Sequence, residues 1–89
     1  MQRILLIEDN KDISANIREY LELEDFFVDT AFDGEVGLEK ALSNTYDIIL
    51  LDLMLPKFDG IHLAQKVSSK KDIPIIMITA RESIDERLL

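Results

Sequence analysis

Short apolar runs alternate with segments of helical periodicity along the whole chain, and this alternation limits the possible folds more than any other feature. The runs are Arg3–Ile7, Phe26–Ala31, Ile48–Leu51 and Pro74–Ile78. Mostly aliphatic and β-branched runs of this length are typical of buried strands. Strands that alternate with helices predict a parallel sheet covered by helices on both faces, which is a three-layer α/β fold.

The segments between the apolar runs carry helix signals. Asn10 and Asp33 stand where N-caps are expected, before the first and second helices. The residues expected to face the core are Ile13, Ile17, Tyr20 and Leu21 in the first helix and Val36, Leu38, Ala41 and Leu42 in the second. A third helix is expected over Ile61–Val67, capped by Asp59, and the capping-box pattern Ser83–Glu86 predicts a fourth.

Composition excludes several classes of protein. The 89 residues suffice for a single domain, 1–89, and the absence of cysteine excludes disulfides and thiolate metal sites. With 18 acidic against 10 basic residues and a net charge of −8, this segment is not expected to bind nucleic acid itself. Its apolar runs are too short for a membrane span or a signal peptide, so a cytoplasmic setting is expected.

The last apolar run suggests that the fold continues. Ile75–Ile78 is apolar on both faces, which suits an interior strand better than an edge strand. We therefore expect at least one more strand–helix unit after Leu89, with a naturally minimal four-stranded protein as the alternative.

Polar residues follow three of the four runs. Glu8 and Asp9 follow the first, Asp52 follows the third, and Thr79 follows the fourth. Ligands of open parallel sheets bind beyond the carboxyl ends of the strands. If the first and third strands are neighbours, the three acids converge there.

Three converging acids need a positive counter-charge. Asp52 is the only polar residue from Ile48 to Leu55, and two carboxylates ~4 Å apart repel by a few kcal/mol at an effective dielectric near 20. A hard divalent cation bound through oxygen atoms would supply that charge, and Mg²⁺ suits one or two carboxylates with waters and a phosphate oxygen. The alternatives are that Asp52 caps a loop or pairs with a lysine, and that Glu8 and Asp9 interact with a helix dipole.

A carboxylate beside a metal ion can attack phosphorus and form an aspartyl phosphate. Because negative charge spreads over the phosphoryl oxygens, the metal and hydrogen-bond donors carry the catalysis. The Thr79 hydroxyl and the backbone N–H groups after Asp52 could donate, although a local hydrogen bond at the strand end is the simpler interpretation of Thr79.

These residues resemble a known family. Glu8-Asp9, Asp52, Met54-Leu55-Pro56 with Asp59-Gly60, and Thr79-Ala80 are similar in order and spacing to the receiver domain of bacterial two-component response regulators. Leu55–Gly60 and Thr79–Glu82 are similar to the OmpR/PhoB-type transcription factors. The resemblance covers the whole chain and implies a flavodoxin-like receiver fold that here lacks the fifth strand–helix unit.

The resemblance also implies a role for each site residue. Asp52 would accept a phosphoryl group from a sensor histidine kinase, and Asp9, Asp52 and the backbone carbonyl of Met54 would bind Mg²⁺. Glu8 would act on the metal through water, whereas Thr79 and the Ala80 backbone would bind the phosphoryl group and report its presence. The module would be a phosphoacceptor rather than an ordinary enzyme, and it would reach DNA only through a carboxyl-terminal output domain.

The sequence leaves other functions open. The family's fifth-strand lysine is missing from these 89 residues, and Lys57 does not replace it by motif. A receiver fragment that cannot be phosphorylated, and that self-associates or swaps elements through the Pro74–Ile78 edge, is therefore the main alternative. An aspartyl-phosphate hydrolase of the haloacid-dehalogenase type would carry an acid at Met54, and no phosphate-binding glycine motif follows any strand. His62, on a helix, is expected to be at the surface or partly packed rather than to take part in chemistry.

Overall fold

The computed structural model describes residues 1–52 and 60–78. Its elements, in chain order, are β1 (Arg3–Ile7), α1 (Lys11–Leu23), β2 (Phe27–Ala31), α2 (Gly34–Ser43), β3 (Ile48–Asp52), α3 (Gly60–Lys70) and β4 (Ile75–Ile78). Each expected strand and helix within the described ranges is present, with ends that differ by a few residues at most.

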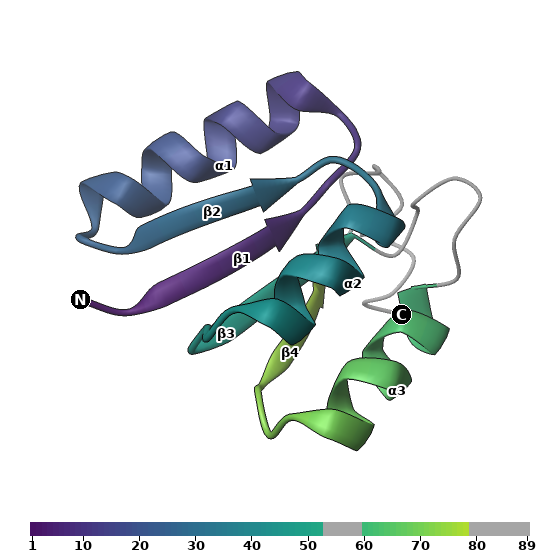
Figure 1. Ribbon diagram of the computed structural model, residues 1–89. Coiled ribbons are helices and arrows are strands. Elements are labelled where there is room, and N and C mark those ends of the chain that lie inside the picture. The colour runs from purple at the N-terminus through teal and green to yellow at the C-terminus, as the bar shows by residue number, and fades with distance from the viewer. Residues whose placement is uncertain (53–59, 79–89) are drawn as a thin grey trace, which may run out of the picture.

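The four strands form one parallel sheet in the order β2-β1-β3-β4. Figure 1 shows α1 on one face of the sheet and α2 and α3 on the other. The predicted three-layer α/β fold is therefore confirmed. None of the described helices is long and apolar enough to cross a membrane.

The larger part of the core lies between the sheet and the α2–α3 layer. Alternate strand residues point to this side, and the cluster consists of Leu5, Ile7, Ala31, Ala41, Tyr46, Ile49, Leu51, Leu63 and Val67. A smaller set of buried strand residues points to the opposite face, where α1 lies: Ile4, Leu6 and Val28. Burial on both faces explains why β1 is an almost continuous apolar run.

The buried face of α1 differs from the predicted one at Tyr20, which is 65% exposed. Ile13, Ile17 and Leu21 face the sheet as expected, and Ser14 is buried with them. At 3.6 residues per turn, Ser14 and Leu21 lie to one side of the line through Ile13 and Ile17, whereas Tyr20 lies to the other. The helix is rotated toward Ser14, so the prediction for Tyr20 was wrong.

In α2 the prediction was wrong for Val36, which is exposed, while Gly37 is buried. The helix approaches β1 so closely that a Cβ atom on Gly37 would lie 2.6 Å from Ile7 Cδ1. The missing side chain allows this approach, and a search for large apolar residues cannot detect it.

The C-terminus of α1 ends in a Schellman motif centred on Asp25, whose φ is 69°. The Phe26 N–H donates to the Leu21 carbonyl at 3.1 Å, and the Asp25 N–H donates to the Glu22 carbonyl at 3.1 Å. Glycine is the usual residue at this left-handed position, because the Cβ of any L-residue lies too close to the following carbonyl oxygen there.

We expect Asp25→Gly to raise the unfolding free energy by about 0.5–1 kcal/mol, since glycine adopts positive φ without a steric cost. Urea unfolding followed by circular dichroism would measure the difference. Glu24→Gly is the matched control, because Glu24 has a φ of −95° and gains nothing from glycine. Equal effects of the two substitutions would contradict the prediction.

Strand β4 lies at one edge of the described sheet, with Ile76 50% and Met77 39% exposed. The predicted fourth helix at Ser83–Glu86 and the Asp59 cap lie outside the described residues. The expected strand–helix unit after Leu89 stays a prediction.

A candidate metal centre at the carboxyl ends of β1 and β3

Neighbouring strands bring the predicted acids together. β1 and β3 pair in parallel, with Ile7 opposite Leu51 at their carboxyl ends. Glu8 directly follows Ile7, and Asp52 directly follows Leu51, so both side chains emerge at the same edge of the sheet. The condition on which the sequence prediction depended, that the first and third strands are neighbours, is met.

The three acids form one cluster. Glu8, Asp9 and Asp52 each offer a carboxylate oxygen, and these oxygens lie within 4.8 Å of one another. Glu8 is 1% exposed and Asp52 is 3% exposed, whereas Asp9 is open to solvent. The cluster is thus sealed on the protein side and accessible from the Asp9 side.

The start of α1 positions Glu8. Asn10 Oδ1 accepts hydrogen bonds from the N–H groups of Asp12 and Ile13 at 2.9 and 3.0 Å, which confirms the predicted N-cap. The backbone N–H of Asn10 donates to Glu8 Oε2 at 3.1 Å. This second role of Asn10 was missed, because a backbone contact leaves no signal in the residue type.

The other oxygen of Glu8, Oε1, is buried and accepts no hydrogen bond within the described ranges. A buried polar atom in this state costs free energy unless a proton, a water or a cation satisfies it.

Burial raises the pKa of Glu8 from 4.5 to about 7. The Asn10 N–H works in the opposite direction, and the charge of Asp52 raises the pKa further. The carboxyl groups of Asp52 and Asp9 also lie close enough to share a proton with Glu8, which favours its neutral form. Near neutral pH the cluster therefore holds a proton or needs a positive charge.

The donor set fits a hard divalent cation. All three ligand atoms are carboxylate oxygens, the type that Mg²⁺ and Ca²⁺ prefer, and the exposed side leaves room for water ligands. Such a cation, with its bound water, would satisfy the buried oxygen Glu8 Oε1.

The other predicted site residues, Met54, Thr79 and Ala80, lie outside the described residues, as does Lys57. His62 is exposed on α3, as predicted. The described part of the site therefore consists of Glu8, Asp9 and Asp52.

Comparison with known proteins agrees with this geometry. Residues 4–88 match the family model of the response regulator receiver domain. The response regulator ArlR of Staphylococcus saprophyticus is 44% identical over 88 residues, and ArlR of Staphylococcus aureus is 40% identical. Each alignment covers 99% of this chain and 40% of the relative, so the chain spans about two fifths of these proteins.

Solved structures show the same fold. The response regulator TrrA of Thermotoga maritima, in complex with Mg²⁺–BeF, matches with a TM-score of 0.86 and 36% identity, covering 99% of this chain and 77% of that one. TrrA in complex with the histidine kinase ThkA matches with a TM-score of 0.84 and 38% identity, covering 90% and 70%. The flavodoxin-like fold expected from the resemblance is confirmed.

Proposed function

Since this chain belongs to the response regulator receiver domain family, we propose that Asp52 accepts a phosphoryl group in the presence of Mg²⁺. The observation that carries the proposal is the meeting of Glu8, Asp9 and Asp52, with one buried oxygen of Glu8 that has no hydrogen-bond partner among the described residues. The module is a signalling domain of a two-component system.

The proposed reaction is a transfer from phosphohistidine. An Asp52 carboxylate oxygen attacks phosphorus, an O–P bond forms as the P–N bond breaks, and the electron pair of that bond leaves with the imidazole. The product is an aspartyl phosphate, so the protein is a reactant that at most catalyses its own phosphorylation and dephosphorylation.

The family resemblance implies a role for each acid. Asp9 and Asp52 would bind the cation directly, and Glu8, held by Asn10, would act on it through water. Bound Mg²⁺ would neutralise negative charge on the phosphoryl oxygens. The family resemblance assigns a third ligand to the Met54 carbonyl and phosphoryl contacts to Thr79 and the Ala80 backbone.

The relatives indicate partners. TrrA is found in complex with a histidine kinase, and we propose a sensor histidine kinase as the phosphodonor of this chain. We propose the cytoplasm as its location and, because the curated relatives are longer, an OmpR/PhoB-type output domain as the part that contacts DNA. Self-association through the β4 edge stays a prediction.

Intact-mass spectrometry after incubation with acetyl phosphate and Mg²⁺ tests the proposal. We expect the mass to rise by one phosphoryl group, with no rise for Asp52→Asn or when EDTA is present. Asp72→Asn, an exposed acid on the loop before β4, is the matched control and should retain the adduct. A folded wild-type chain without an adduct, or an adduct that persists in Asp52→Asn, would refute the assignment.

A further inference from the structure

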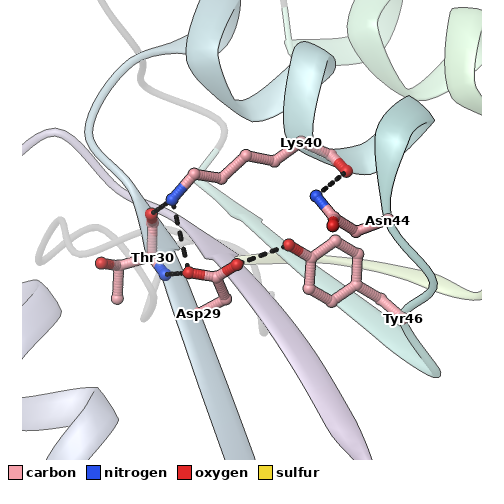
Figure 2. A network of polar contacts seen from close by, with 5 residues as sticks. All are labelled: Asp29, Thr30, Lys40, Asn44 and Tyr46. Carbon is pink, nitrogen blue, oxygen red and sulfur yellow. Dashed lines mark hydrogen bonds and ion pairs between the residues drawn. The ribbon is translucent and has the colours of Figure 1, made fainter.

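The second edge of the described sheet, formed by β2, carries an ion pair that has no part in the acidic cluster. Asp29 lies in β2 and Lys40 in α2, and Lys40 Nζ is 3.3 Å from Asp29 Oδ1. The Tyr46 hydroxyl donates to Asp29 Oδ2 at 2.6 Å and holds the carboxylate in place. Figure 2 shows this network, with Asp29 between Lys40 and Tyr46.

The ion pair occupies two backbone groups of one residue, Thr30. The Thr30 N–H donates to Asp29 Oδ1 at 3.1 Å, and the Thr30 carbonyl accepts from Lys40 Nζ at 2.8 Å. Both contacts are visible in Figure 2. The Asp29 carboxylate thus occupies the position that a backbone carbonyl of a neighbouring strand would take. The Lys40 ammonium occupies the position of that strand's backbone N–H.

Those two backbone groups point away from the sheet. The Phe27 N–H donates to Gln2, and the Ala31 carbonyl accepts from Glu8, so both residues face β1. Backbone groups of alternate residues in a strand point to opposite sides, so Val28 and Thr30 face the open side of β2. A further strand would have to bond to Thr30 in the middle of this edge.

We propose that the Asp29–Lys40 ion pair closes the open edge of β2 to strand pairing, and that a second copy of this chain is the partner which this edge takes when the ion pair is lost. Edge strands are templates for pairing with another chain, and charged side chains on the edge are one way to prevent it.

The sequence of β2 favours a second copy as the partner. A twofold axis through Thr30 would pair two β2 strands antiparallel, and each Thr30 would exchange both of its hydrogen bonds with its counterpart. In that register Val28 lies opposite Phe32 of the other copy, and both side chains are on the same face as Thr30. Phe32 is 42% exposed and Val28 is 4% exposed, so the apolar contact would be made by Phe32 against the edge of the buried Val28.

Lys40→Met tests the proposal on the full chain. It removes the ammonium and keeps a long side chain, and we expect the weight-average mass in sedimentation equilibrium to rise toward twice the monomer mass. Lys66→Met changes the net charge equally on the exposed surface of α3, and Lys40→Arg retains a cation; both should behave like the wild type. Self-association of Lys40→Met should exceed that of Lys66→Met by about tenfold or more.

Amide hydrogen exchange locates the contact and does not depend on a variant folding. In the wild type, the Thr30 amide should exchange slowly although it faces away from the sheet. In associated Lys40→Met, protection should extend to Val28. The proposal is overturned if wild-type Thr30 exchanges as fast as an unstructured amide, if Lys40→Met and Lys66→Met have equal masses, or if association leaves Val28 unprotected.

Discussion

Replacing Asp52 with asparagine is expected to make the metal-free protein more stable, by about 1–2 kcal/mol near pH 8, while it lowers Mg²⁺ affinity by about 100-fold or more. The carboxylate oxygens of the cluster lie within 4.8 Å of one another. At an effective dielectric near 20, two charges at that separation repel by about 3 kcal/mol. A proton taken up by Glu8 relieves part of this repulsion, so the expected gain is smaller.

Asp52→Asn is expected to raise the stability of the metal-free protein and to lower its Mg²⁺ affinity, and this combination identifies Asp52 as part of the metal site. Mg²⁺ that binds only the folded state stabilises it by about 2.7 kcal/mol when its concentration is 100 times its Kd. The urea midpoint of the wild type should rise when Mg²⁺ is added. The midpoint of Asp52→Asn should be higher than that of the wild type in EDTA and should change little with Mg²⁺. Asp72→Asn should follow the wild type in both conditions. A variant that retains the full Mg²⁺ response would exclude Asp52 as a ligand, and one that is less stable in EDTA would contradict the predicted relief of repulsion.

The sequence predicted the strands and the acidic cluster for one physical reason. β1 is buried on both faces, and β3 is buried on one face and half-buried on the other, so their apolar runs have no polar interruption and the first polar residues mark the strand ends. Parallel strands end at the same edge, so Glu8, Asp9 and Asp52 meet there without further information. Asn10 and Asp33 cap their helices as predicted, since a side-chain oxygen before a helix satisfies its first N–H groups.

The predictions failed where a small residue decides the packing. Val36 was placed inward because it is large and apolar, but α2 contacts β1 through Gly37, whose lack of a Cβ allows the close approach. In α1, the buried Ser14 rotates the helix and leaves Tyr20 exposed. Periodicity reports which residues can be buried, and the neighbouring element decides which of them are.

Long-range polar contacts were also missed. Asp29 interrupts the second apolar run, and a charged residue there was the available signal. Its partners, Lys40 and Tyr46, are 11 and 17 residues away. No local pattern connects the three residues, because their contacts depend on how α2 and the loop before β3 lie beside β2.

In metal-free buffer, the unfolding free energy is expected to fall by about 2–3 kcal/mol as the pH rises from about 4.5 to about 8. The pKa of Glu8 is about 7 in the folded protein, against 4.5 for an ordinary glutamate. The folded state therefore holds a proton that the unfolded chain releases, and the stability from that proton is present below pH 4.5 and lost as the pH rises through 7. Most soluble domains gain stability over the lower half of this range.

Glu8→Gln isolates the contribution of this one group. Glutamine resembles the protonated carboxyl, so the variant should keep the low-pH stability of the wild type up to pH 8, and the difference between the two chains cancels all other titrations. Urea unfolding at several pH values in EDTA measures that difference. Parallel curves for the two chains would show that Glu8 ionises normally in the folded protein.

Saturating Mg²⁺ should reverse the trend in the wild type. A cation beside the ionised carboxylates supplies the charge that the proton supplied, so Mg²⁺ affinity should increase with pH until Glu8 is fully ionised near pH 8. In Glu8→Gln the affinity should be lower and nearly independent of pH across the same interval. The proton on Glu8 and the cation, acting on Glu8 through a bound water, would then be alternative sources of positive charge beside the buried oxygen Glu8 Oε1, and the pH at which they exchange would follow the pKa of Glu8.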